Sequence, residues 1–130
     1  MELTEHTAEH HNQIRGVEAH RVRINEQWYD ASLLVGAHYL EPDWSATSLS
    51  DLDEERSQAL IELAPELVII GVGERQKFLP HAVQRAFIRH GIGIECMTLD
   101  AAARTFNVLM SEDRRALAGL IIASEDNPSD

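Results

Sequence analysis

The sequence predicts an α/β fold, and two apolar runs are the main reason. Residues 67–70 form an apolar run that continues into Gly71-Val72-Gly73, and residues 92–96 form a second run that ends at Met97-Thr98. A stretch of helical character follows each run. Strands alternating with helices are typical of parallel sheets, in which successive carboxyl ends meet at one edge. We therefore expect Gly73 and Thr98 to lie at a common rim, where α/β proteins usually bind ligands.

The first third of the chain predicts a β-hairpin. The pattern alternates over residues 17–24, with His20, Val22 and Ile24 on one face and Arg21 and Arg23 on the other, which is typical of a half-exposed strand. Asn25 and Glu26 suit a turn, and residues 28–35 form the expected partner strand. A further short strand is expected over residues 38–40, before a loop rich in serine and threonine.

The middle of the chain predicts a helix followed by a buried strand. Ser50 or Asp53 can cap the helix, because acidic residues that follow them favour the positive end of the helix dipole. The helix is expected to run to about Leu63, and Pro65 ends it. The buried strand is expected over residues 66–71.

The last part of the chain predicts two more helices and a closing strand. Pro80 suits the first turn of a helix, and Gly91 suits its end. Thr98 can cap the helix expected over residues 100–109, whose alanines allow close packing on a sheet. The apolar stretch at residues 116–122 favours a strand, although part of it also suits a helix.

Composition limits the functional classes. The 130 residues suit one domain, expected over residues 14–123, with disordered tails over residues 1–13 and 124–130. The net charge of −11 disfavours a nucleic-acid binder, because phosphate neutralisation needs a cationic face. The single cysteine excludes an internal disulfide, and the N-terminus lacks the pattern of a signal peptide. No apolar run approaches the about 20 residues that span a membrane, so we expect a cytoplasmic protein without membrane insertion.

Four segments carry a family resemblance: residues 65–73, 91–98, 102–109 and 112–114, with Ala-Ala-Arg-Thr-Phe-Asn at 102–107 as the most specific part. The chain resembles the Mth938-like domain family over about residues 14–123. The resemblance implies a three-layer α/β fold: a central mixed, mostly parallel sheet flanked by helices, with an added N-terminal β-hairpin. It implies no established enzymatic activity. A eukaryotic relative is similar to a mitochondrial assembly factor for respiratory complex I, which acts by binding proteins.

Six residues are candidates for binding a ligand at the rim: Gly71, Gly73, Thr98, Arg104, Thr105 and Asn107. The glycines can expose backbone N–H groups to an anion, and Arg104 shares a helix face with Asn107. A structural interpretation stands beside this one. In it, Arg104 pairs with Glu112, Thr105 bonds back to its own helix, and Asn107 ends the helix in a left-handed conformation.

No residue pattern specifies a reaction, and we expect no catalytic residue, no metal site and no cofactor. The Gly71–Gly73 turn differs from a dinucleotide fingerprint, because Gln76 occupies the third glycine position and Pro80 delays the helix. Cys96 is expected to be buried and inert.

Two functional hypotheses remain. The first is a non-enzymatic protein-binding or assembly factor, whose surface combines the hairpin with the loops at Gly73 and Thr98. The alternative is a binder of a small anionic ligand, or an enzyme, that uses the amides of Gly71–Gly73 together with Arg104. The sequence does not specify an oligomeric state.

Overall fold

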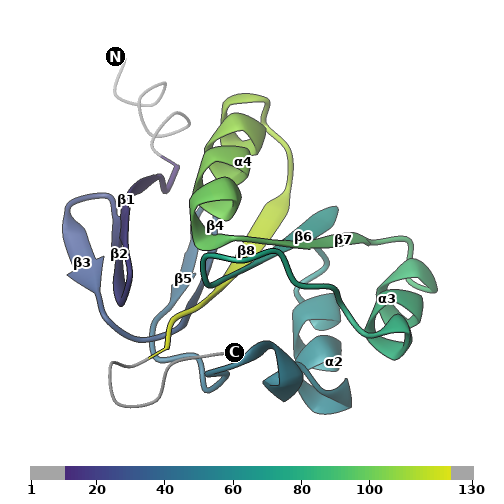
Figure 1. The fold of residues 1–130 in the computed structure, drawn as a ribbon. Helices are drawn as coiled ribbons and strands as arrows, with labels where there is room; N and C mark the ends of the chain where they lie inside the picture. The colour runs from purple at the N-terminus through teal and green to yellow at the C-terminus, as the bar shows by residue number, and fades with distance from the viewer. Residues whose placement is uncertain (1–10, 124–130) are drawn as a thin grey trace.

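A computed structural model describes residues 11–123, which fold into two sheets and three α-helices (Figure 1). The predicted tails at 1–13 and 124–130 therefore lie largely outside the described residues. Near the start of this range, Asn12 Nδ2 donates to the carbonyl oxygens of Gly36 and Tyr39 at 2.9 and 3.1 Å. Within residues 11–123, no helix combines the length and apolar character needed to cross a membrane.

The N-terminal region forms a three-stranded antiparallel sheet in the order β1-β2-β3. Its strands are β1 (Ile14–Glu18), β2 (Arg21–Ile24) and β3 (Gln27–Tyr29). The single strand predicted over residues 17–24 is wrong, because the chain turns between β1 and β2. Val17 pairs with Val22 across that turn, so both apolar side chains lie on one face of the sheet. In one continuous strand Val17 and Val22, which are five positions apart, would lie on opposite faces, so the turn shifts the phase of the alternation.

The partner strand predicted over residues 28–35 is also wrong in extent. It is broken after Tyr29, and its second half enters the other sheet. Ser32, which is 2% exposed, lies at the break. Its Oγ accepts a hydrogen bond from Ile122 N, and its carbonyl accepts one from Trp44 N, both at 2.8 Å. These long-range bonds direct the chain into the central sheet.

The central sheet has five strands in the order β5-β4-β8-β6-β7. They are β4 (Leu33–Gly36), β5 (Tyr39–Glu41), β6 (Leu67–Val72), β7 (Gly93–Met97) and β8 (Ala116–Ile121). Strand β6 is parallel to both β7 and β8, whereas β4 is antiparallel to β5 and β8. The sheet is therefore mixed, as predicted, and the last apolar stretch is a strand.

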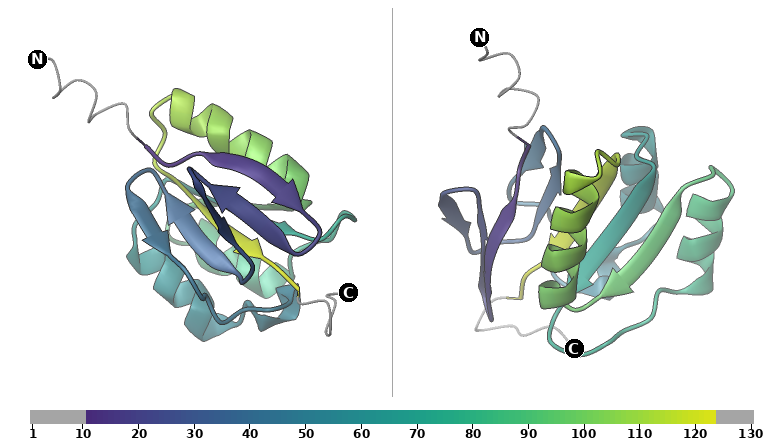
Figure 2. Two further views of the ribbon diagram at one scale, coloured as in Figure 1. Left: turned by 90° about the vertical axis from the view of Figure 1, so that its left-hand side faces the viewer. Right: turned by 90° about the horizontal axis from the view of Figure 1, so that it is seen from above.

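Three α-helices cover the central sheet: α2 (Glu54–Glu62), α3 (His81–Ile88) and α4 (Leu99–Ser111). Figure 2 shows the N-terminal sheet and α4 on one side of the central sheet, with α2 and α3 on the other. This arrangement confirms the predicted three-layer α/β fold. The predicted end of α4 near Leu109 falls short, because the helix continues to Ser111.

The layer formed by α4 and the N-terminal sheet packs closely on the central sheet. Phe106 of α4 and Val22 of β2 are fully buried in one apolar core, together with Leu33 of the central sheet. Gly71 permits the close approach of α4, since a Cβ at this position would lie 2.6 Å from the Cβ of Ala102. Real Cβ atoms do not come this close, so the residue opposite the helix must lack a side chain.

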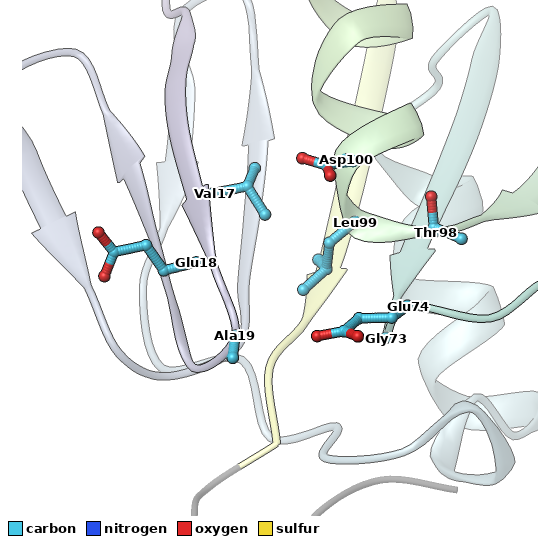
Figure 3. Close-up of a pocket in the computed structure, with 8 residues that line it drawn as sticks. All are labelled: Val17, Glu18, Ala19, Gly73, Glu74, Thr98, Leu99 and Asp100. Atoms are coloured by element: carbon cyan, nitrogen blue, oxygen red, sulfur yellow. The ribbon is translucent and has the colours of Figure 1, made fainter.

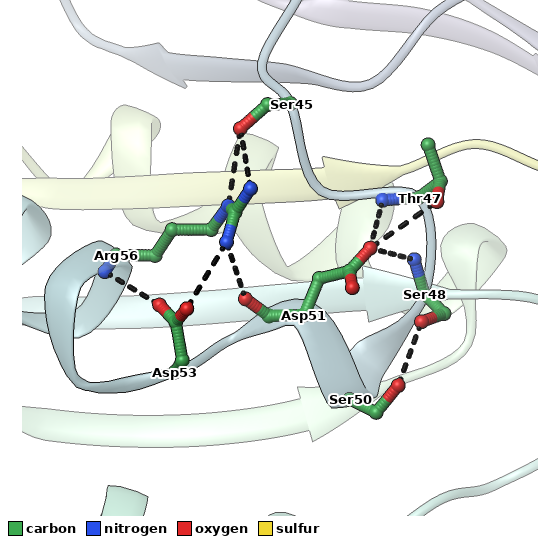
Figure 4. Close-up of polar contacts among 7 residues, drawn as sticks. All are labelled: Ser45, Thr47, Ser48, Ser50, Asp51, Asp53 and Arg56. Carbon is green, nitrogen blue, oxygen red and sulfur yellow. Dashed lines mark hydrogen bonds and ion pairs between the residues drawn. The ribbon is translucent and has the colours of Figure 1, made fainter.

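The layer formed by α2 and α3 is smaller and is held partly by polar contacts. Phe87 of α3 and Leu60 of α2 are fully buried against the central sheet. A polar network fixes the chain before α2 (Figure 4). Asp51 Oδ2 accepts hydrogen bonds from the backbone N–H of Thr47 and Ser48, and the Arg56 guanidinium binds Ser45 Oγ. This network determines where α2 begins.

Candidate functional site

The predicted rim lies at the carboxyl ends of β6 and β7. These strands are parallel neighbours, and Gly71 pairs with Met97 near their ends. Leu99 N donates a 3.0 Å hydrogen bond to the carbonyl of Gly73. Gly73 has a φ of 65°, a left-handed conformation that glycine adopts without strain. The structure therefore brings Gly73 and Thr98 together at one edge of the sheet.

A cleft lies between this rim and the N-terminal sheet, and we call it the rim cleft. It encloses about 290 Å3. Its walls are the end of β1 with the following turn, the loop after β6, and the first turn of α4. The lining residues are Val17, Glu18, Ala19, Gly73, Glu74, Thr98, Leu99 and Asp100 (Figure 3). The cleft therefore exists only because two sheets face each other.

The rim cleft combines an apolar wall with two carboxylates. The side chains of Val17 and Leu99 point toward each other across the gap, and Figure 3 shows the carboxylates of Glu74 and Asp100 directed toward the N-terminal sheet. The carboxylate of Glu18 points away, and it accepts a 2.7 Å hydrogen bond from Arg21 Nε. Among the described residues that line the cleft, none is a Lys, Arg or His. The charge presented to a ligand is therefore negative.

The fold of α4 starts at the rim. Thr98 precedes its first turn, and Thr98 Oγ1 accepts a 3.2 Å hydrogen bond from Ala101 N. This is the capping role expected from the sequence. The hydroxyl accepts this bond and keeps its own O–H as a donor.

The remaining predicted site residues do not line the rim cleft. Gly71 lies within β6 and pairs with both neighbouring strands. Arg104 is exposed on α4 and Thr105 is half-buried. The structural interpretation paired Arg104 with Glu112, but the ion pairs found within residues 11–123 do not include this one. Arg114 instead pairs with Glu66 at 2.7 Å.

Asn107 joins α4 to the N-terminal sheet. Its Oδ1 accepts a 2.9 Å hydrogen bond from Ile14 N, and its Nδ2 donates a 2.8 Å hydrogen bond to Ile14 O. The interpretation of Asn107 as a helix terminator is therefore wrong, since α4 continues to Ser111. Beyond the helix, Asp113 is the residue that adopts a positive φ, at 59°. Asn107 therefore holds α4 and β1 together within one layer.

The environment of Cys96 matches the inert role expected for it. Burial raises the pKa of the Cys96 thiol, and the opposing effect of Lys77 is smaller. The thiol is therefore protonated at neutral pH, whereas a nucleophilic cysteine needs the thiolate. Across residues 11–123, no group of three or more His, Cys, Asp or Glu side chains is arranged to hold a metal ion.

Six of the eight residues that line the cleft were not candidates from the sequence: Val17, Glu18, Ala19, Glu74, Leu99 and Asp100. Glu74 follows the Gly71–Gly73 turn directly and Asp100 follows Thr98, so both were available from the same strand-end argument. Val17, Glu18 and Ala19 could not be found this way, because they lie in β1 and the turn after it and not at the strand ends of the central sheet.

Comparisons with known proteins agree with this architecture. The chain is 36% identical over 80 residues to the bovine (Bos taurus) protein named NADH dehydrogenase [ubiquinone] 1 alpha subcomplex assembly factor 3, a match that covers 60% of this chain and 44% of the relative. The chain thus spans less than half of that relative's length.

Solved structures match over most of the chain. A Xanthomonas campestris protein, determined by NMR, has a TM-score of 0.81 at 34% identity and covers 94% of this chain and 92% of its own. A Bordetella pertussis protein described as a Mth938-like domain has a TM-score of 0.74 at 22% identity, covering 92% of this chain and 91% of its own. At that identity the likeness concerns the fold alone.

A family model described as a protein of unknown function (DUF498/DUF598) matches residues 14–121, a span that holds both sheets and all three α-helices. The resemblance stated from the sequence is thereby confirmed. The chain belongs to this family of unknown function, and it has the Mth938-like fold.

Proposed function

We propose that this protein is a non-enzymatic assembly factor that binds a basic segment of another protein in the rim cleft. The observation that carries the proposal is the cleft itself, an apolar hollow with two carboxylates directed into it. Support also comes from the name of the bovine relative, which describes an assembly factor.

A lysine or arginine side chain has the chemistry that fits the cleft. Its aliphatic stem can cover Val17 and Leu99, while its cation lies near the carboxylates of Glu74 and Asp100. An anion would meet negative charge at the same place. A cationic partner therefore fits the rim better than the anionic ligand suggested by the sequence. The anionic ligand stays a prediction, and so does the cytoplasmic location.

The test is affinity capture from native cells with matched charge variants. Parent protein is compared with the double variant Glu74→Gln/Asp100→Asn, which removes both cleft carboxylates. The control is Glu55→Gln/Glu62→Gln, which removes two exposed carboxylates of α2 that do not line the cleft. Crosslinking mass spectrometry then locates the contact.

The expected result is a partner recovered by the parent and the control but lost with the cleft variant, with crosslinks from its lysines to the rim. Equal recovery by all three proteins would reject the cleft as the binding surface. Recovery of no specific partner by the parent would count against a protein-binding function altogether.

A further inference from the structure

A second hollow lies on the opposite side of the central sheet, between α2 and α3. We call it the α2–α3 groove, and it encloses about 400 Å3. This volume lies within the roughly 300–1,000 Å3 of known ligand pockets. The small side chains of Ser57, Ala82 and Ala86 leave the space open, above a floor that includes Ile61 and Val83.

The buried hydroxyl of Ser57 marks the groove as incompletely packed. Ser57 is 3% exposed, and its Oγ has no hydrogen-bond partner within the described part of the chain. Buried polar side chains normally have a partner. A larger apolar side chain at this position of α2 would fill the groove and remove the unpaired atom. The sequence instead keeps an open, mainly apolar channel between the two helices.

The two helices run in the same general direction. Residues 63–66 lead from α2 into the start of β6, and residues 89–92 lead from α3 into the start of β7. These strand starts are paired, Leu67 with Gly93. The carboxyl ends of both helices therefore lie at one edge of the sheet, and their amino ends point away from it.

The groove is charged at its ends and apolar between them. Asp53 and Glu54 line it at the amino end of α2, whereas Arg89 and His90 line it beyond the carboxyl end of α3. Asp53 is partly neutralised by Arg56 at 3.3 Å. Glu54 and Arg89 have no ion pair with another described residue. The groove therefore presents separated negative and positive ends to solvent.

We infer that the α2–α3 groove binds an amphipathic α-helix of a partner protein, running antiparallel to α2 and α3. Apolar side chains at helical spacing would occupy the channel. Helices commonly carry acidic residues in the first turn and basic residues in the last. In the antiparallel direction the acidic turn meets Arg89 and His90, and the basic turn meets Glu54. The rim cleft takes no part in this inference, which stands whether or not the proposed function holds.

The test uses two synthetic peptides of about 15 residues, long enough for four helical turns. Both carry leucines at i, i+3, i+4 and i+7. One has glutamates in its first turn and lysines in its last turn, and the other has these charges exchanged. Binding is measured by fluorescence anisotropy, and the contact is mapped from amide shifts in NMR spectra. We expect the parent to bind the first peptide at least about fivefold more tightly, with shifts confined to α2 and α3.

The two peptides also differ in their own helix stability, because their terminal charges are exchanged. A protein variant with exchanged groove charges separates this effect from the contribution of the groove. The double variant Glu54→Lys/Arg89→Glu should prefer the second peptide. The control Glu55→Lys/Arg85→Glu exchanges charges on the same helices outside the groove and should keep the parent's preference. Circular dichroism verifies that all three proteins are folded. The cleft variant Glu74→Gln/Asp100→Asn should also bind as the parent does.

Three results would overturn the inference. The first is the absence of saturable binding of either peptide by the parent. The second is an unchanged preference in the groove variant, and the third is a reversed preference in the control. Self-association of the parent that the groove variant abolishes would assign the surface to a second copy of this chain instead.

Discussion

The two faces of the central sheet are covered in different ways. One face carries the 13-residue helix α4, which packs against β1, β6 and β8 and is clamped to the N-terminal sheet through Asn107. The other carries two shorter helices, α2 and α3, with an open groove between them. On the first face, which we call the closed face, α4 and the N-terminal sheet together form one core with the central sheet. On the second face, the open face, α2 and α3 leave a groove open to solvent.

The difference indicates how the fold separates stability from recognition. The closed face positions the rim cleft, because the N-terminal sheet that α4 holds also supplies Val17 and Ala19. The open face leaves small side chains and unpaired charges on its surface. We therefore expect substitutions in the core between α4 and the sheet to act mainly on the free energy of unfolding, and substitutions of residues that line the rim cleft or the α2–α3 groove to act mainly on binding.

The largest expected effect tests whether the structure around a new cavity relaxes less on the closed face than on the open face. Phe106 and Phe87 are both fully buried, one on each face. Phe106→Ala should cost about 3–5 kcal/mol, and Phe87→Ala should fall near the lower end of that range, because a cavity costs less where its surroundings can collapse. Urea unfolding measures both. A larger loss for Phe87→Ala would reverse the proposed contrast.

The second prediction, of intermediate size, tests the hydrogen bonds by which Asn107 joins α4 to the N-terminal sheet. Asn107→Ala leaves the backbone N–H and C=O of Ile14, a residue 4% exposed, without their partner. Losing this contact should cost about 1–3 kcal/mol. Hydrogen exchange should show faster exchange of the Ile14 amide than in the parent. Val108→Ala, next along α4 and 53% exposed, is the control and should change stability by less than about 0.5 kcal/mol. Unaltered exchange at Ile14 in Asn107→Ala would show that packing alone holds β1.

The smallest effect tests whether the open face is the more sensitive to acid. Hydrogen bonds from the backbone and side chain of Thr47 and from the backbone of Ser48 hold the pKa of Asp51 below its usual 3.8, with Arg56 adding to the shift. A lowered folded pKa stabilises the fold above the unfolded value, and this contribution disappears as the pH falls through the folded value. The clamp at Asn107 is neutral and has no such dependence.

Urea unfolding at about pH 6 and at about pH 3, on either side of the unfolded pKa, measures this contribution. The parent should lose more stability than Asp51→Asn between the two conditions. NMR signals of residues 45–56 should broaden in acid before those of β1. An equal loss in parent and variant would show that Asp51 does not link the start of α2 to pH.

Local sequence patterns were sufficient for the second half of the fold. The apolar run before Gly71 and the one before Met97 became the neighbouring parallel strands β6 and β7, because apolar runs that alternate with helices are typical of a parallel sheet. Thr98 caps α4 because N-capping depends only on the next few residues. Gly73 and Thr98 could thus be placed at the rim before the structure was known.

The remainder depended on contacts between distant parts of the chain. Asn107 and Ile14 are 93 positions apart, and no local pattern marks Asn107 as the partner of a backbone amide. Residues 17–24 were predicted as one strand, whereas the chain turns after β1 and pairs Val17 with Val22. Neither the rim cleft nor the α2–α3 groove was predicted, because each forms between segments that are distant in the sequence.

The sequence by itself determined the strands and helices of the α/β core, since apolar periodicity and capping act over a few residues. Only the tertiary structure decided that the N-terminal sheet faces the rim and that α2 and α3 leave a groove between them. These arrangements follow from the packing of side chains that are far apart in the chain. The surfaces to which we assign binding therefore belong to the assembled layers and to no single segment.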